Sequence, residues 1–138
     1  GGKLFALGKC GERFAVRNSG ATAVTEGAGD HCCEYMTGGK IVVLGSTGRN
    51  IGAGMTGGIA YILDEKNELE DKVNKEIVSI YKITNIIQEK ILLNILNEYY
   101  EKTNSLKASQ IIKNWSQYKG IFKIVVPPSE KEMLGIEN

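Results

Sequence analysis

The sequence is poor in the residues that build disulfide frameworks, metal centres and membrane spans. It contains 3 cysteines, 1 histidine, 1 tryptophan and 2 prolines among 138 residues. An odd number of cysteines, two of them adjacent, argues against a disulfide framework and favours a reducing compartment. Because no apolar run approaches the roughly 18 residues of a membrane-spanning helix, we expect no membrane as a partner.

A strong excess of charge of either sign is also missing. Lys and Arg number 17 against 16 Asp and Glu, which gives a formal net charge of +1. Since nucleic acids attract concentrated basic surfaces, we expect no nucleic acid as a partner. Apolar residues make up 42% of the chain, which is enough for a modest core. The length corresponds to one domain or to a piece of one.

Glycine is abundant, and it follows a repeat. Fifteen of the 17 glycines lie within residues 1–58. The segment Met-Thr-Gly-Gly at 36–39 recurs at 55–58. Short runs of small, branched or aromatic residues follow four evenly spaced leading glycines, Gly2, Gly20, Gly39 and Gly58. We therefore expect strands of about four residues near 4–6, 21–24, 41–43 and 59–62.

The close spacing of these strands decides the predicted fold class. It leaves no room for the helix of an ordinary crossover between parallel strands. Stacking each strand directly on the preceding one, at about 4.8 Å, is the simpler solution. We therefore predict a mainly β fold, with a right-handed parallel β-helix of 18–19-residue coils over residues 1–63. Residues 64–138 would form a helical capping segment of the same domain, ending in a short strand.

The glycines of the repeat are expected at coil corners with positive φ. Replacing Gly39 or Gly58 there would cost on the order of 1–2 kcal/mol. A literal G-x-G-x-x-G occurs at residues 52–57, but a dinucleotide fingerprint needs a helix after its last glycine. Because Gly57 precedes a strand-like run instead, we interpret this motif as corner glycines and not as a nucleotide site.

The run His31-Cys32-Cys33 is the candidate for a metal or catalytic cysteine site. Tetrahedral zinc usually takes four ligands in spaced pairs, whereas adjacent cysteines in a strand point to opposite faces. A catalytic cysteine and histidine would need a third, orienting group, which we do not identify. We therefore interpret Cys10, Cys32 and Cys33 as small buried residues. The sequence predicts no catalytic, cofactor-binding or metal-ligating residue.

Charged residues of the glycine-rich part have two open interpretations. They could form ion pairs that brace the coil corners, or they could face a neighbouring domain and hold it in register. Their spacing does not resemble paired catalytic carboxylates. The residues concerned are Glu12, Arg13, Arg17, Glu26, Asp30, Glu34 and Arg49.

Apolar residues at helical spacing dominate the second half of the chain. They predict helices over 69–81 and 87–100, the second opened by a capping box of Asn85 and Gln88. A further helix is expected over 105–118, followed by a strand at 121–126. We expect these elements to cap one end of the β-helix, which would otherwise expose an unpaired strand edge.

Three segments carry a specific resemblance to a known family. They are GERFAVRNSGA at 11–21, EGAGDHCCEYMTGG at 26–39 and GRNIGAGMTGG at 48–58. They closely resemble the C-terminal GXGXG domain of the glutamate synthase large subunit, and the resemblance continues more loosely over 64–138. The ending at 125–130 is similar to the ferredoxin-dependent form of plastids and cyanobacteria.

The resemblance implies a parent enzyme that makes L-glutamate from glutamine-derived ammonia and 2-oxoglutarate. In this family a cysteine amidotransferase domain hydrolyses glutamine, and FMN, fed by ferredoxin through a 3Fe-4S cluster, reduces 2-iminoglutarate. The GXGXG domain is structural there, packed on the flavin-containing synthase domain and the amidotransferase domain. The resemblance therefore implies that Cys10, Cys32 and Cys33 are not cluster ligands, and that the parent resides in the plastid stroma or, alternatively, in a bacterial cytoplasm.

Two alternatives stay open at the level of the sequence. The chain could be a free-standing GXGXG scaffold subunit that assembles with separate amidotransferase or flavin subunits, or it could belong to an NAD(P)H-dependent glutamate synthase. Since it opens in mid-repeat on Gly1-Gly2, we expect a fragment that lacks preceding coils. Alone, such a fragment would be inactive and marginally stable or prone to aggregation.

Overall fold

The computed structural model describes residues 3–5, 19–27, 29, 32–34, 36–76 and 78–130. Within these ranges the strands are β1 (Lys3–Phe5), β2 (Ser19–Thr25), β3 (Thr37–Val43), β4 (Gly57–Leu63), β5 (Ser79–Lys82) and β6 (Phe122–Val126). The α-helices are α1 (Ile86–Thr103), α2 (Leu106–Lys113) and α3 (Trp115–Tyr118). Two short 3-10 turns complete the set, η1 (Leu69–Lys72) and η2 (Pro128–Glu130). None of these helices is both long and apolar enough to cross a membrane.

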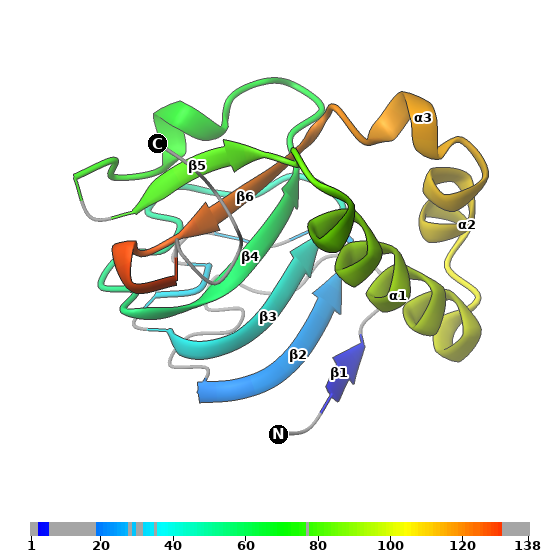
Figure 1. The fold of residues 1–138 in the computed structure, drawn as a ribbon, viewed down its shortest axis with the longest axis horizontal. Helices are drawn as coiled ribbons and strands as arrows, with labels where there is room; N and C mark the ends of the chain where they lie inside the picture. Colours follow the sequence, from blue (N-terminus) through cyan, green and yellow to red (C-terminus); the bar gives the residue numbers. More distant parts are fainter. Residues whose placement is uncertain are drawn as a thin grey trace.

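All six strands belong to one open, mixed sheet with the order β1-β2-β3-β4-β6-β5 (Figure 1). Strands β1 to β4 are parallel, whereas β6 runs antiparallel to both β4 and β5. Residues that face each other in the parallel part are separated by one repeat of the sequence, as in the pairs Ile41–Ala60 and Thr22–Lys40. The strands predicted from the glycine repeat are therefore confirmed, and so is their parallel pairing.

The predicted fold class, a mainly β protein with a right-handed parallel β-helix, is wrong, because the protein combines an open sheet with α-helices. The four repeated strands continue into the antiparallel strands β6 and β5, and the sheet stays open. Between β3 and β4, where every residue is described, the chain forms turns, bends and one isolated bridge, with no further strand that would close a coil. The repeat spacing shows that successive strands stack. It does not show whether the intervening residues are strands, and here glycine-rich turns suffice to bring the chain back.

The helix predicted over residues 69–81 is also wrong. Leu69 begins the short turn η1, Val73 forms an isolated parallel bridge with Ile51, and Tyr81 lies in β5. Apolar spacing in this segment is compatible with a helix, but the edge of β6 offers a strand partner, and pairing with it decides the local structure.

The helix predicted over residues 87–100 is confirmed as α1. The Gln88 N–H donates to Asn85 Oδ1 at 2.9 Å, which makes Asn85 the N-cap, and Gln88 Oε1 accepts the Thr84 N–H at 3.3 Å. The helix ends at Thr103, and its C-cap residue Asn104 has a left-handed φ of 56° that closes the last turn. The helix predicted over 105–118 is divided by Asn114 into α2 and α3.

The two faces of the sheet are buried in separate cores. On one face, packed by α1 and α2, a row of paired residues crosses all six strands: Phe5, Val24, Val42, Tyr61, Ile124 and Tyr81. On the other face, covered by turns, the corresponding row contains Ala23, Ile41, Ala60, Val125 and Ile80. Because both faces are covered, the strands are apolar at nearly every position, and β4 is buried along its whole length.

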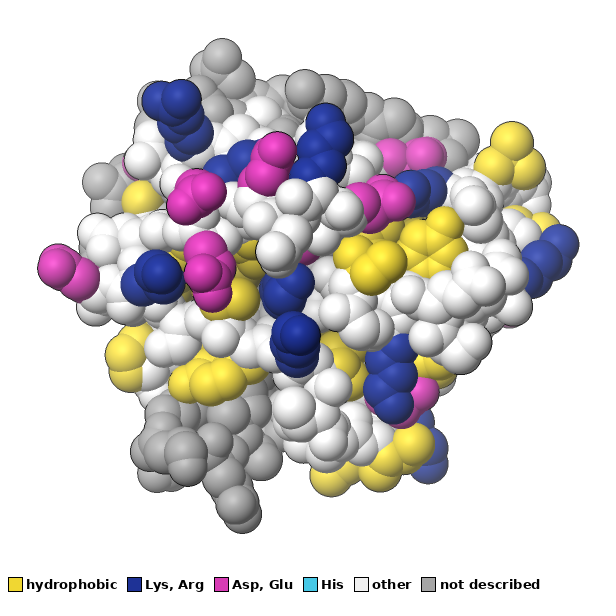
Figure 2. Space-filling model, turned by 90° about the horizontal axis from the view of Figure 1, so that it is seen from above, with side chains coloured by type: hydrophobic (Ala, Val, Ile, Leu, Met, Phe, Trp, Pro, Cys, Tyr) yellow, Lys and Arg dark blue, Asp and Glu magenta, His cyan; other side chains and the backbone are white. Residues whose placement is uncertain are grey.

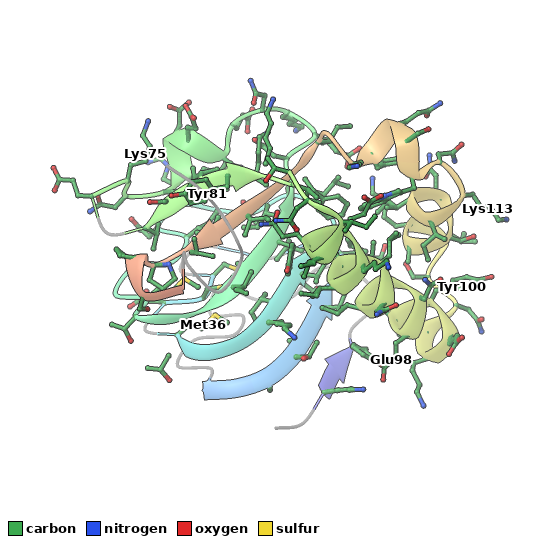
Figure 3. All side chains as sticks on the ribbon, viewed as in Figure 1. Met36, Lys75, Tyr81, Glu98, Tyr100 and Lys113 are labelled. Carbon is green, nitrogen blue, oxygen red and sulfur yellow. The ribbon has the colours of Figure 1, made fainter. Side chains whose placement is uncertain are left out.

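Helix α1 extends across the first face as far as the edge strand β1. The rings of Phe5 and Tyr99 meet edge to face, with centroids 5.8 Å apart. Beside them Lys3 Nζ lies 2.6 Å from Glu98 Oε1, and Figure 3 shows Glu98 on the part of α1 near β1. Packing against α1 therefore holds this short edge strand in place.

The hydroxyl of Tyr61 is an exception within the helix-covered core. The side chain is fully buried, and its oxygen has no hydrogen-bond partner in the described part of the chain. Burial raises the pKa of Tyr61 from 10.0 to about 12. A buried hydroxyl without a partner destabilises the fold, because it loses water and gains nothing in return.

Replacing Tyr61 with Phe should therefore stabilise the protein, by about 1 kcal/mol. The neutral phenol is favoured in the folded state, so stability falls as the pH rises from 10 through about 12, and the variant should lose less stability in this window. Urea unfolding of the chain, followed by Trp115 fluorescence, measures both effects. The control is Tyr99→Phe, because the Tyr99 hydroxyl is not among the buried unpaired atoms. A Tyr61→Phe variant less stable than the wild type would contradict the assignment.

Candidate functional site

The glycine-rich turns form a layer on the second face of the sheet. We call the described residues of 26–36, 44–56 and 64–78 the turn layer. Backbone hydrogen bonds join successive copies. One starts at the end of β2, from Leu44 N–H to Thr25 O (2.9 Å), and three lie between the turns: Gly48 N–H to Gly29 O (3.3 Å), Gly52 N–H to Cys32 O (2.8 Å) and Thr56 N–H to Met36 O (2.9 Å). The last copy stacks on residues 64–78, where the Ile51 N–H donates to Lys72 O at 3.1 Å.

The turn at residues 51–55 repeats the turn at 32–36. The second residue of each turn is left-handed, with φ of 62° at Cys33 and 74° at Gly52. In each turn the fifth residue donates its N–H to the carbonyl of the second, at 3.2 and 3.0 Å. The repeat found in the sequence therefore corresponds to the same turn conformation formed in two successive copies.

Close approach between copies explains the glycine of the Met-Thr-Gly-Gly segments. Gly39 and Gly58 have φ of 91° and 89°, which confirms the positive φ predicted for both. A Cβ added at Gly58 would meet the Met36 methyl group and lie 3.0 Å from the Gly38 carbonyl. A Cβ at Gly45 would overlap a backbone carbonyl of the preceding copy. Backbone conformation and space together therefore require glycine at position 58.

The G-x-G-x-x-G segment at 52–57 has few backbone donors left for a phosphate. Its N–H groups at positions 52, 53, 55, 56 and 57 donate to carbonyls of the same or the preceding turn. A nucleotide loop instead points such groups at the ligand from the start of a helix. Gly57 begins strand β4, which agrees with our interpretation of this motif as turn glycines.

Cys32 and Cys33 lie side by side in the apolar core beneath the turn layer. Both are fully buried, as predicted, and their Sγ atoms are 3.4 Å apart. The expectation that they point to opposite faces is wrong, because these residues form a turn and not a strand. The hydrogen bond shared with Cys32, together with burial, raises the pKa of the Cys33 thiol. Cys10 and His31 lie outside the described residues.

Within the ranges that the structure describes, no three His, Cys, Asp or Glu side chains come close enough to hold a metal ion. Of the charged residues expected to brace corners, Glu26 and Glu34 are half-buried and Arg49 is exposed. Their role in ion pairs or in contacts with a neighbouring domain stays a prediction. Glu12, Arg13, Arg17 and Asp30 lie outside the described ranges.

Asp64 organises the corner where the turn layer meets the sheet. Its carboxylate accepts the N–H groups of Glu68 and Leu69, at 2.9 and 3.2 Å, and lies 3.5 Å from Lys123 Nζ. Lys72 Nζ donates to the Thr47 carbonyl at 2.7 Å, so η1 is tied to the preceding turn. A cavity of about 130 Å³ opens beside this corner. No local pattern in the sequence indicates the contacts of Lys72 and Lys123, because their partners Thr47 and Asp64 lie 25 and 59 residues away along the chain.

On the opposite side of the sheet, Glu89 joins two helices. Its carboxylate accepts the Trp115 Nε1–H at 2.6 Å and pairs with Lys119 Nζ at 3.1 Å. The Trp115 hydrogen bond first, and Lys119 second, lower the pKa of Glu89. The Trp115 ring also packs against Phe122, which links α1, α3 and β6. On the face seen in Figure 2, acidic and basic side chains are mixed, and apolar side chains form small separate groups.

Replacing Gly58 with Ala should destabilise the protein by about 2 kcal/mol or more, because the new Cβ meets backbone atoms at positive φ. Gly20→Ala is the matched control, since a Cβ there meets nothing within 4 Å. We expect it to be neutral or slightly stabilising. Urea unfolding of both variants measures the difference. Equal stabilities of the two variants would contradict close packing of the turn layer.

Comparisons with known proteins find relatives that match nearly the whole chain. The chain is 57% identical to the chloroplastic ferredoxin-dependent glutamate synthase of Spinacia oleracea over 132 residues. It is 58% identical to ferredoxin-dependent glutamate synthase 2 of Synechocystis sp. over 132 residues, and 60% identical to the ferredoxin-dependent glutamate synthase of Antithamnion sp. over 131 residues. These matches cover 95–96% of this chain but only 8% of each relative.

The family model described as the GXGXG motif matches residues 1–128. This range contains the turn layer and all six strands of the sheet. The resemblance drawn from the glycine-rich segments is therefore confirmed, and the chain belongs to the GXGXG motif family.

Proposed function

We propose that the chain is a structural, non-catalytic region of a ferredoxin-dependent glutamate synthase. The parent would be an oxidoreductase that makes L-glutamate from glutamine-derived ammonia and 2-oxoglutarate, with electrons from reduced ferredoxin. The observation that carries this proposal is 57–60% identity to three such enzymes along nearly the whole chain. Since relatives named here include chloroplastic and cyanobacterial enzymes, we propose the plastid stroma as its location, with a bacterial cytoplasm as the alternative.

The geometry supports a structural role for this region. The polar backbone groups of the turn layer bond to one another, and the thiols of Cys32 and Cys33 are buried. A sheet covered on both faces and joined by stacked turns is suited to hold other parts of a large protein at a fixed spacing. We propose that it packs within the parent against the flavin-containing synthase domain and the amidotransferase domain.

FMN and a 3Fe-4S cluster belong to the parent in this proposal. The residues described here do not fit these groups. An iron–sulfur cluster takes several cysteine thiolates, whereas Cys32 and Cys33 are adjacent and share their apolar core with no third ligand among the described side chains. Five of the six backbone N–H groups at 52–57 are bonded within the fold. We therefore place both groups elsewhere in the parent.

Steady-state kinetics of the full-length protein that carries this chain test the proposal. With glutamine and 2-oxoglutarate, we expect glutamate formation that depends on reduced ferredoxin. In the Gly58→Ala variant we expect a shorter half-life at raised temperature but unchanged KM values for both substrates, because a structural region acts on stability and not on substrate binding. Gly20→Ala should match the wild type in both measurements.

Three results would contradict the proposal. Activity driven by NAD(P)H and not by ferredoxin would favour the pyridine-nucleotide form of the enzyme. A native 15.1 kDa polypeptide assembled with separate amidotransferase or flavin subunits would favour the scaffold subunit. Loss of FMN or iron in Cys32→Ser or Cys33→Ser protein of normal stability would place a cofactor ligand in this chain.

A further inference from the structure

The turn at residues 32–36 carries a cysteine side chain at a left-handed position where its repeat has glycine. The same turn is built again one repeat later with Gly52 at the left-handed position, where glycine is free of strain. At Cys33 that position holds a side chain at φ of 62°, a conformation that costs about 1 kcal/mol or more. The consequence is that both thiols point to the same side, with their Sγ atoms 3.4 Å apart.

Backbone hydrogen bonds fix the two thiols in this arrangement. The Cys32 carbonyl accepts the Gly52 N–H at 2.8 Å, and the Cys33 carbonyl accepts the Met36 N–H at 3.2 Å. Hydrogen bonds from the next copy and from within its own turn therefore fix the backbone of the pair. Such preorganisation favours ligands that bind both sulfurs at once, because little conformational freedom remains to be lost.

The surroundings restrict which ligand could bind. The pair is fully buried in a core with Met36, Ile41 and Met55, and a charged ion is strongly disfavoured in such an environment. No third His, Cys, Asp or Glu among the described side chains completes a metal site. A suitable ligand is thiophilic, needs two sulfurs only and leaves the closed site uncharged.

We propose that Cys32 and Cys33 form a chelating dithiol site for trivalent arsenicals. An organic arsenoxide, R–As=O, condenses with the two thiols: two S–H bonds break, two As–S bonds form, and the oxygen leaves as water with both protons. Arsenic stays trivalent, no electron is transferred, and the product R–As(S–Cys)2 is neutral. Because the pair is buried, the reagent enters when the turn layer opens locally. The site is independent of the glutamate-forming reaction proposed above.

Phenylarsine oxide is the probe for this site, applied to the full-length protein under native conditions. Trypsin cleaves after Arg17 and Lys40, and peptide 18–40 contains Cys32 and Cys33 but no other cysteine. We expect this peptide to gain one reagent mass less one water. Chelation by two linked sulfurs should hold the arsenical about a hundredfold more tightly than one thiol does. The adduct should therefore survive a monothiol and be removed by 2,3-dimercaptopropanol.

Matched variants separate chelation from ordinary thiol labelling. Cys32→Ser and Cys33→Ser should each abolish the monothiol-resistant adduct, whereas Cys10→Ser should keep it on peptide 18–40. Labelling that occurs only after unfolding in urea would overturn the proposal, and this comparison needs only the wild type. An adduct that resists a monothiol equally well in either serine variant would overturn it too.

Discussion

The hydrogen-bond ladder between successive glycine-rich turns is the constraint on which the rest of the structure depends. Gly52 and Thr56 donate their N–H groups to the Cys32 and Met36 carbonyls of the preceding copy, so each turn lies directly on the turn before it. This stacking sets strands β2, β3 and β4 in parallel register at nearly the same offset. It also requires glycine where a Cβ would touch the preceding copy, as at Gly58. One spacing in the sequence therefore governs turns, strands and glycine positions together.

Burial of both sheet faces follows from this arrangement. The turn layer covers one face, and α1 with α2 covers the other, so the central strand β4 has no exposed residue. Fixed contacts brace each side: Asp64 pairs with Lys123 of β6 on the turn side, and Glu89 joins α1 to α3 on the helix side. A region built in this way changes shape little, which is the property that our proposed structural role requires.

The sequence predicts the repeated strands and their parallel pairing because one short period specifies both. It also predicts α1 with its Asn85 cap and the positive φ of Gly39 and Gly58. These features depend on local chemistry: capping, backbone freedom and the alternation of apolar residues. Family membership was accessible for the same reason, since the glycine segments that carry it are local.

Features that depend on distant partners could not be predicted in this way. The open sheet follows from pairing of β4 with β6, which comes after all three α-helices in the chain. No repeat in the sequence indicates this pairing. The same strand draws residues 79–82 into the sheet and out of the predicted helix. At the site, alternation in a strand suggested opposed thiols at Cys32 and Cys33. Gly52 occupies the position of Cys33 in the next copy, and a glycine there indicates a left-handed turn. This indication is visible only when the two copies are aligned.

Amide hydrogen exchange at the ladder positions tests the central claim most directly. The N–H groups of Gly52 and Thr56 lie outside the strands, yet they donate at 2.8 and 2.9 Å to the preceding copy. If the stacked turns hold the fold together, these two amides exchange as slowly as those shared between β3 and β4. Exchange of Gly52 and Thr56 at the rate of an unstructured peptide, while the β3 and β4 amides stay protected, would contradict the account.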